Sequence, residues 1–257
     1  MVRKKYIMFA LPFILFMIFM VLIPLGLLFY HAFSHYGEFT FDNFTRMFND
    51  GYSLRVLWQS IWIALVVTIT TLLIAYPIAY GLNMAGFKRK TTILILFTVP
   101  LWTNLLLRSI ALRNVFSLIN IEPGLGALLF ALVFNFLPIT ILPIYIVLSN
   151  IDKRYIEASR DLGASPLRVF FKTVLPLSTP GIVASIILVF TPVVSTFFIS
   201  AFFGGNNYMF GELLASFFPE EFGGGAARSV ILLAMLVFTV IILNKFSKVG
   251  NKRGGLW

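Results

Sequence analysis

The stretch NIDKRYIEASRDLGASPLRVFFKTVLPLSTP, residues 150–180, is a polar and basic segment between two long apolar runs. Its first half has apolar residues at helical spacing and charged residues on the other faces, which predicts a short amphipathic helix. The apolar stripe expected on this helix consists of Ile151, Tyr155, Ala158 and Leu162. A second short helix is expected to carry Leu167, Phe170, Phe171 and Val174 on one side and to end at Pro176.

The residues between these two helices carry the signals that end one helix and start another. Gly163 is the residue type that closes a helix in the left-handed conformation. Ser165 can cap the next helix, and Pro166 suits its first turn, where no amide donor is needed. The segment therefore predicts a tight helix-turn-helix. Because helices of about ten residues are not stable alone in water, the pair must pack against something else.

The composition is that of an integral membrane protein. With 59% hydrophobic and 12% charged residues, and a mean hydropathy of +0.94, the chain cannot fold in water without large exposed apolar patches. A bilayer core about 30 Å thick needs about 20 apolar residues per helix. Runs of that length occur near residues 7–30, 57–82, 91–112, 125–148, 179–203 and 229–246. We therefore expect an all-α membrane protein with six transmembrane helices, in a single domain over residues 1–257.

The basic residues are distributed unevenly across this six-span arrangement. All but five of the 20 Lys and Arg residues fall on the side that holds the two termini and residues 150–178. The five on the other side are Arg46, Arg55, Arg108, Arg113 and Arg228. By the positive-inside rule, both termini and the segment 150–178 are expected in the cytoplasm. The net charge of +10 is explained by this asymmetry, and no nucleic-acid partner is expected.

The sequence offers no catalytic constellation. No Gly-rich phosphate loop precedes a Lys, and no Ser-His-Asp or zinc pattern can be assembled. His31 and His35 are one helical turn apart with Glu38 nearby, but we interpret them as ordinary polar residues at a membrane interface and expect no metal site. We expect that the chain is not an enzyme, and that any ATP used is bound by another chain.

Polar groups at membrane depth are the default candidates for a transport path. The stretch PLWTNLLLR, residues 100–108, places Trp102, Asn104 and Arg108 in an apolar run, and Asn104 and Arg108 would share a helix face. The other candidates are Tyr76, Asn135 and Tyr145. Each has an alternative interpretation, as an interfacial anchor for the first group and as a helix-helix contact for the second.

The segment 150–180 resembles the signature loop of the membrane subunits of bacterial ABC importers, which reads EAA, three residues, Gly, nine residues, Ile, one residue, Leu-Pro. The matching positions are Glu157, Ala158, Ser159, Gly163, Thr173, Leu175 and Pro176. Ser159 replaces the second Ala of the pattern, and Thr173 replaces the Ile. The resemblance implies a type I importer permease fold in which Glu157, Ala158, Ser159, Gly163, Leu175 and Pro176 form a cytoplasmic coupling loop that docks on an ATPase subunit.

Further stretches are similar to the first permease subunit of spermidine/putrescine importers (PotB-like). They are FTFDNF at residues 39–44, PLWTNLLLR, EASRDLGAS at residues 157–165 and FGG at residues 203–205. The resemblance implies a multi-pass protein of the bacterial cytoplasmic membrane. Its expected partners are a second homologous permease, two ATPase subunits that bind ATP and Mg, and an external polyamine-binding protein. It also implies that this chain binds no cofactor itself.

Charge placement leaves the substrate open. A polyamine is a multiply charged cation, yet no Asp or Glu lies inside a predicted span, and Arg108 would repel a cation if it faced the path. Passage would then use aromatic faces, backbone carbonyls or carboxylates of a partner. The alternatives are an importer for another small solute, such as an anion, and an ATP-independent secondary transporter, which should show buried ionisable residues or an internal repeat. A membrane-embedded enzyme is the least favoured class.

Overall fold

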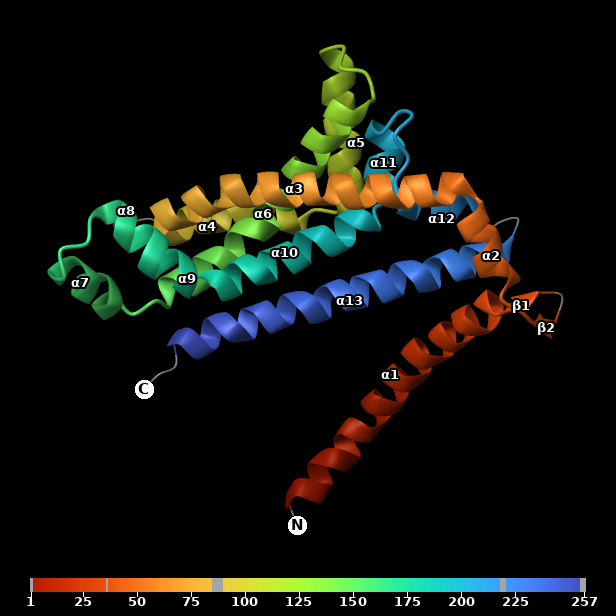
Figure 1. Ribbon diagram of the computed structural model, residues 1–257, viewed down its shortest axis with the longest axis horizontal. Helices are drawn as coiled ribbons and strands as arrows, with labels where there is room; N and C mark the ends of the chain where they lie inside the picture. The colour runs from red at the N-terminus through yellow and green to blue at the C-terminus, as the bar shows by residue number, and fades with distance from the viewer. Residues whose placement is uncertain (1, 36, 85–89, 218–220, 255–257) are drawn as a thin grey trace. The chain divides into compact units, whose positions relative to one another are not determined.

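The computed structural model describes residues 2–35, 37–84, 90–217 and 221–254, most of which lie in helices (Figure 1). Contacts divide the chain into two compact units. One contains Met1–Arg55 and Leu213–Met235, and the other contains Val56–Glu212 and Leu236–Trp257. Helices α3 (Gly51–Met84), α12 (Phe210–Phe217) and α13 (Phe222–Gly254) contribute residues to both units.

The first unit begins with the long helix α1 (Val2–Ala32). A small antiparallel hairpin of β1 (Ser34–His35) and β2 (Glu38–Phe39) follows, and then helix α2 (Asp42–Asn49). Small residues let α1 and α13 pack closely, because Ala32, Ala226 and Ala227 are fully buried together. Phe33 and Phe44 pack against these alanines.

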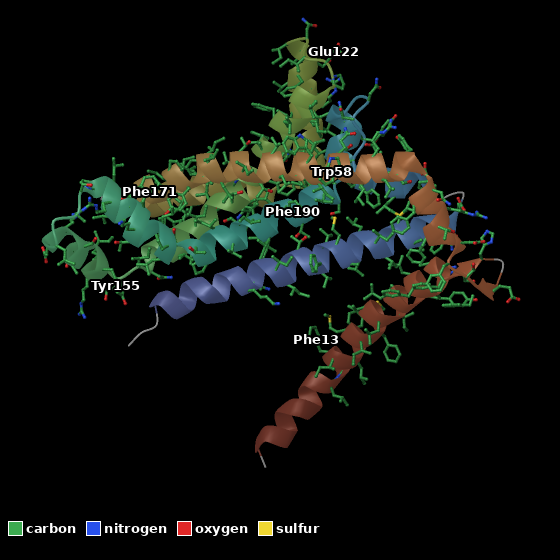
Figure 2. The ribbon with its side chains drawn as sticks, in the orientation of Figure 1. Phe13, Trp58, Glu122, Tyr155, Phe171 and Phe190 are labelled. Carbon is green, nitrogen blue, oxygen red and sulfur yellow. The ribbon has the colours of Figure 1, made fainter. Side chains whose placement is uncertain are left out.

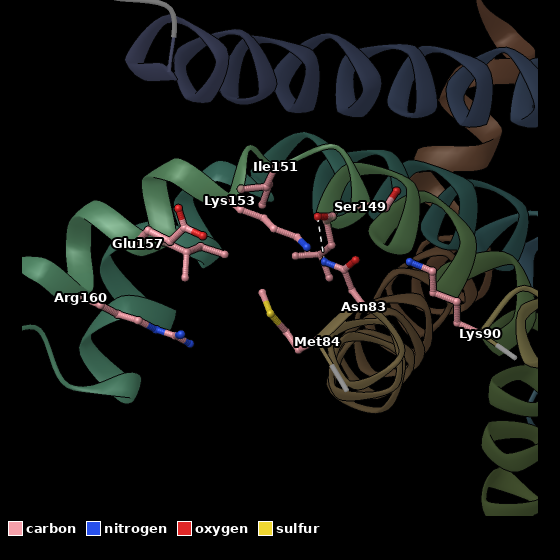
Figure 3. Close-up of a pocket in the computed structure, with 10 residues that line it drawn as sticks. Asn83, Met84, Lys90, Ser149, Ile151, Lys153, Glu157 and Arg160 are labelled. Atoms are coloured by element: carbon pink, nitrogen blue, oxygen red, sulfur yellow. Dashed lines mark hydrogen bonds between the residues drawn. The ribbon is translucent and has the colours of Figure 1, made fainter. Parts of the chain in front are cut away.

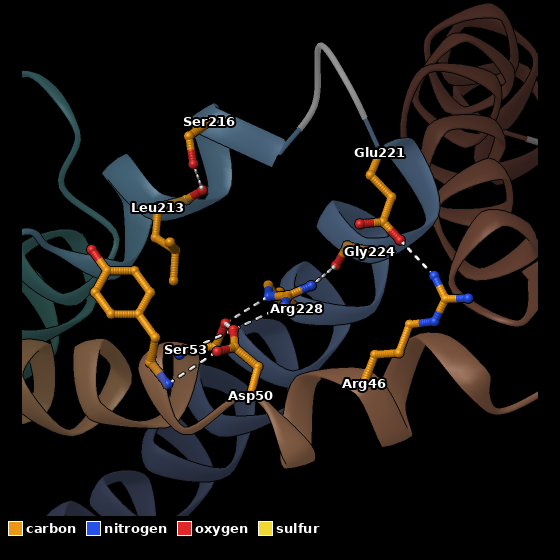
Figure 4. A network of polar contacts seen from close by, with 9 residues as sticks. Arg46, Asp50, Ser53, Leu213, Ser216, Glu221, Gly224 and Arg228 are labelled. Atoms are coloured by element: carbon orange, nitrogen blue, oxygen red, sulfur yellow. Dashed lines mark hydrogen bonds and ion pairs between the residues drawn. The ribbon is translucent and has the colours of Figure 1, made fainter.

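A buried arginine ties the parts of the first unit together (Figure 4). Arg228 of α13 is only 4% exposed. Its Nε donates to Ser53 Oγ at 3.0 Å, its Nη1 to the Gly224 carbonyl at 3.1 Å and its Nη2 to Asp50 Oδ2 at 3.4 Å. The guanidinium also lies 3.9 Å from the centre of the Phe217 ring. Each of the three nitrogens of this desolvated cation therefore has a hydrogen-bond partner, and one face of the guanidinium lies over a ring, as a buried charge requires.

Asp50 links the same arginine to the start of α3. Its carboxylate accepts the backbone amides of Tyr52 at 3.1 Å and Ser53 at 3.3 Å, which caps the helix. The Ser53 hydroxyl, followed by these amides and Arg228, lowers the pKa of Asp50 below its usual value against a smaller opposing effect of burial. Asp50 therefore stays ionised at pH values where an unpartnered Asp begins to take up a proton.

The second unit contains the remaining helices. They are α4 (Lys90–Thr98), the 3₁₀ turn η1 (Val99–Trp102), α5 (Leu105–Leu118), α6 (Leu125–Ser149), α7 (Lys153–Asp161), α8 (Pro166–Val169), the π-helical turn η2 (Phe170–Val174), α9 (Leu175–Leu177), α10 (Thr179–Val194) and α11 (Phe198–Phe203). Helix α10 packs along α6. The approach is closest at Gly181, where an added Cβ would lie 2.9 Å from the Pro143 carbonyl oxygen and 3.1 Å from Val147.

Among the described residues, four helices are long and apolar enough to cross a membrane, and up to six spans result if each of two bent helix pairs counts as one. The four are α1, α3, α6 and α13, which correspond to the predicted runs 7–30, 57–82, 125–148 and 229–246. On these helices many outward side chains are large and apolar. Phe13 and Trp58 are exposed in this way, whereas Phe190 of α10 is buried (Figure 2).

The other two predicted runs are not continuous helices. The run 91–112 is bent by 94° between Trp102 and Leu105. Pro100 lies in η1 just before the bend, and Asn104 starts a new helix after it. The run 179–203 stops at Val194, where three residues separate α10 from α11. Each of these two apolar runs therefore contains a helix break, which an average of hydropathy over the run does not reveal.

Replacing Gly181 tests the close packing of α6 and α10. Gly181→Ala should lower the thermal unfolding midpoint of the purified protein, because the methyl group overpacks the interface at a cost of about 1–3 kcal/mol. Gly81→Ala is the matched control, since a Cβ there meets nothing within 4 Å, and Ala is the better helix former by about 1 kcal/mol. Equal midpoints for the two variants would contradict this account.

Candidate functional site

The segment after α6 folds as a helical hairpin, which we define as residues 151–178. Asp152 caps α7 by accepting the amide of Arg154 at 3.0 Å. At the other end of α7, Gly163 has φ of +77°. The Gly163 amide donates to the Arg160 carbonyl at 2.8 Å, and the Ala164 amide to the Ser159 carbonyl at 3.2 Å. This pair of bonds is a Schellman motif, so the predicted helix end at Gly163 is confirmed.

The second half of the hairpin starts as predicted and ends later. Ser165 Oγ accepts the amide of Arg168 at 3.4 Å, and Pro166 occupies the first turn of α8. The second helix was expected to end at Pro176, but it continues past that residue. The turn before it widens to a π-helix, in which the Leu175 amide bonds to the Phe170 carbonyl. This wider turn carries the chain past Pro176, and the helix bends at Ser178 instead.

The inner face of the hairpin packs on the ends of α3 and α6. Ile156, Val169 and Val174 are buried in one cluster with residues of those two helices. The α3 and α6 residues of this cluster are Ala75, Tyr76, Ala79, Ile141, Ile144 and Leu148. The hairpin is thus anchored by apolar packing, which supplies the stability that its short helices lack.

The predicted apolar stripes are only partly buried within this chain. Ile156 is the buried residue of α7, whereas Tyr155 and Ala158 are exposed and Leu162 is 89% exposed. In the second half, Val174 is buried and Phe170 is half-buried as expected. Leu167 and Phe171 were expected beside them and are exposed instead. Helical spacing groups residues into faces, but it does not say which face meets the rest of the protein.

These exposed residues give the hairpin a second apolar surface, which we call the outer face. It consists of Tyr155, Leu162, Leu167 and Phe171, and Figure 2 shows Tyr155 and Phe171 projecting from the hairpin. Glu157 and Ala158 are exposed on the same segment. In the described part of the chain, Glu157 forms no salt bridge. The outer face therefore combines exposed apolar side chains with a carboxylate that has no salt-bridge partner among the described residues.

The two departures from the importer pattern lie against each other. Thr173 Oγ1 of η2 donates to Ser159 Oγ of α7 at 3.2 Å. Both side chains are half-buried between the two halves of the hairpin. A hydroxyl pair thus takes the place that an Ala and an Ile would fill by apolar contact. The sequence showed both substitutions, but not that they form a pair.

Tyr76, a predicted path residue, lies at the root of the hairpin. Its hydroxyl is 2.8 Å from Ser178 Oγ, and Ser178 also bonds to the Leu175 carbonyl at 3.0 Å. The Tyr76 ring packs edge-on against Phe170. Tyr145 packs against the same cluster. These two tyrosines therefore connect α3 and α6 with the bend at Ser178.

A second group of predicted residues surrounds the 94° bend. Arg108 of α5 donates from Nε to Asn135 Oδ1 at 2.6 Å and from Nη2 to the Asn135 carbonyl at 3.4 Å. Its Nη1 donates to the Pro100 carbonyl, which also accepts the Thr103 hydroxyl at 2.8 Å. Arg108 forms no salt bridge within the described ranges. It acts as a clamp that joins η1, α5 and α6 through neutral acceptors.

Asn104 and Trp102 do not join this clamp. Asn104 is the N-cap of α5, where its side chain accepts the Leu106 amide at 2.8 Å. The expectation that Asn104 and Arg108 form one polar helix face was therefore wrong. Trp102 is 89% exposed at the end of η1. An Asn directly before an apolar run is a helix-start signal, and it would have located this break in the sequence.

The six predicted path residues thus form two groups, one at the bend near Arg108 and one at the root of the hairpin. In the ranges that the structure covers, no three His, Cys, Asp or Glu side chains are grouped so that they could hold a metal ion. His31 packs edge-on against the ring of Phe222.

Comparison with known sequences gives consistent matches. A family model described as "binding-protein-dependent transport system inner membrane component" matches residues 71–249. The chain is 32% identical over 259 residues to the spermidine/putrescine transport system permease protein PotB of Haemophilus influenzae, covering 89% of this chain and 90% of that protein. It is 35% identical to PotB of Escherichia coli K12, covering 68% and 70%. It is 26% identical to PotC of H. influenzae, covering 66% of each chain.

Solved structures resemble the fold along most of the chain. A bacterial ABC transporter involved in the import of the acidic polysaccharide alginate matches with a TM-score of 0.74 at 11% identity, covering 96% of each chain. The alginate transporter in complex with an alginate-bound periplasmic protein matches with a TM-score of 0.73 at 12% identity, covering 96% of this chain and 95% of that one. At these identities the likeness establishes the fold alone.

A double-mutant cycle tests the hydroxyl pair of the hairpin. Ser159→Ala leaves the Thr173 hydroxyl without its partner, and Thr173→Ile leaves the Ser159 hydroxyl without its partner. Each substitution should therefore destabilise the hairpin by about 1 kcal/mol. The double variant should be less destabilised than the sum of the two, with a coupling of about 0.5–1 kcal/mol. The measurement is denaturant unfolding of the purified protein. Strictly additive effects would show that the hydroxyls do not interact.

Proposed function

Because the chain belongs to the family of binding-protein-dependent transport system inner membrane components, we propose that it is the permease subunit of an ATP-driven importer of polyamines such as spermidine and putrescine. The observation that carries the proposal is the 32% identity to a spermidine/putrescine permease over 89% of this chain. Its apolar helices and its family make it a multi-pass inner membrane protein.

The proposed arrangement in the membrane has six spans in one domain, with both termini in the cytoplasm. The pair bent by 94° would then form one span, another span would begin at α10, and residues 150–178 would form a cytoplasmic coupling loop. The support comes from the distribution of Lys and Arg. Eight residues of that distribution have side chains whose placement is not described: Arg3, Lys4, Lys5, Lys88, Arg89, Lys248, Lys252 and Arg253.

Coupling to ATP hydrolysis is proposed to occur through the outer face of the hairpin. Tyr155, Leu162, Leu167 and Phe171 would insert into a partner that carries the ATP and Mg, with Glu157 as the charged contact. Apolar side chains this exposed are costly at a cytoplasmic surface unless another protein covers them. Gly163, Leu175 and Pro176 would hold the shape of the hairpin, while Ala158 would allow close approach.

The other proposed partners follow from the family. PotB and PotC relatives are both similar to this chain, which supports a second homologous permease beside it. Two ATPase subunits and an external polyamine-binding protein would complete the importer. One structural neighbour was solved with a periplasmic protein bound, which is consistent with such an external partner.

The clamp at Arg108 bears on the choice of substrate. A free cation in the path would favour an anionic solute, which is the second candidate for this importer. The guanidinium is bonded to Asn135 and Pro100, so it holds the bend. These acceptors are neutral and its charge remains, so the preference for a polyamine rests on the identity to PotB, with aromatic side chains or backbone carbonyls as the contacts for the cationic amines.

Reconstitution tests the substrate class. The chain, its partner permease, the ATPase subunit and the binding protein are placed together in liposomes, and ATP hydrolysis is measured with spermidine, putrescine or an organic anion present. We expect stimulation by a polyamine only. Stimulation by the anion alone would show that the importer carries an anionic solute, which is the second candidate. ATP hydrolysis that no solute changes would contradict the importer assignment.

Removing one apolar anchor tests the docking surface. Leu162→Ser should weaken retention of the ATPase subunit by about tenfold, because truncating an anchor that becomes buried at an interface costs about 1–2 kcal/mol. Leu118→Ser is the control, since Leu118 is similarly exposed, at 82%, but lies at the end of α5. The measurement is co-purification of the ATPase subunit. Equal retention in both variants would rule out the outer face.

A further inference from the structure

A pocket of about 430 Å³ lies between α7 and the ends of α3 and α6, and Glu157 is among its lining residues (Figure 3). Asn83 and Met84 at the end of α3, Ser149 at the end of α6, and α7 itself form its walls. Asn83 is held there by a bond from its Nδ2 to the Leu148 carbonyl at 2.9 Å. The walls are therefore the ends of two membrane helices and one side of the hairpin.

Three cations line this pocket. Lys90 approaches from α4, and Lys153 and Arg160 approach from α7, with their charged ends directed into the space between the elements (Figure 3). Glu157 is the one acid among the lining residues. None of these four side chains forms a salt bridge in the described part of the chain, whereas the neighbouring Arg154 pairs with Asp152. The pocket therefore has an uncompensated positive charge.

An apolar surface adjoins the basic pocket. Beyond Lys90, helix α4 turns Leu94 and Phe97 toward the protein core, and it leaves Ile95 and Leu96 exposed. Ile146, one turn before the end of α6, is exposed as well. A ligand that combines an anionic group with apolar chains would match both the pocket and this surface. The headgroup region of a membrane offers such ligands, and basic pockets between helix ends bind them.

We propose that this pocket binds the phosphate headgroup of an anionic phospholipid. Lys90 and Lys153 hold the phosphate from two sides, and the acyl chains lie along the exposed side of α4. The proposal concerns a lipid site and does not depend on which solute is transported.

The test is native mass spectrometry of the complete importer, purified in detergent and supplied with phosphatidylglycerol or phosphatidylcholine. The wild type should retain phosphatidylglycerol and not phosphatidylcholine. The variant K90Q/K153Q should lower that retention by about tenfold or more, since each Lys beside a phosphate contributes several-fold in affinity. K90R/K153R keeps the charge and should retain the lipid. R154Q/R168Q removes the same charge outside the pocket and should behave as the wild type.

Three outcomes would overturn the proposal. One is equal retention of phosphatidylglycerol by K90Q/K153Q and the wild type. Another is complete displacement of the lipid by excess inorganic phosphate, which would assign the pocket to a free anion. The third is loss of the ATPase subunit from K90Q/K153Q with lipid retention unchanged, which would assign the pocket to the partner protein. Polyamine-stimulated ATP hydrolysis is measured on the same samples, so failure of the lipid site is distinguished from failure of the importer assignment.

Discussion

The need to satisfy backbone hydrogen bonds where helices break constrains this structure more than any other interaction. Hydrocarbon offers no partner to the amides and carbonyls that a break releases. At the 94° bend, Asn104 caps the new helix, and the Pro100 carbonyl accepts donors from Thr103 and Arg108. At the hairpin root, the Ser178 hydroxyl donates to the Leu175 carbonyl and is hydrogen-bonded to the Tyr76 hydroxyl. Asn104, Thr103 and Ser178 therefore satisfy backbone groups at the places where the chain changes direction.

The hairpin has two faces with different roles. Its inner face is fixed by Ile156, Val169 and Val174, which are buried against α3 and α6. Its outer face leaves Tyr155, Leu162, Leu167 and Phe171 exposed. A segment of this length cannot be stable and also present an apolar surface unless one side is anchored. The anchoring contacts are thus a precondition for any docking on the outer side.

The sequence predicted local features well and tertiary ones poorly. The helix end at Gly163 and the cap at Ser165 depend on conformational preferences of single residues, so they were recognised. The burial of Ile156 instead of Tyr155 depends on where α3 and α6 lie, which periodicity does not contain. The bond between Arg108 and Asn135 joins residues 27 positions apart, and the pairing of Ser159 with Thr173 crosses a turn. Helix breaks were missed because hydropathy averages over them.

The hydroxyl pair across the hairpin has a mechanical consequence. Thr173 is bonded to Ser159, and the helix runs from η2 through α9 without interruption to Ser178. The two halves of the hairpin are thus joined by a polar contact in addition to the Gly163 turn. A change in the position of α7 would therefore be felt by η2, which leads directly to the bend before α10.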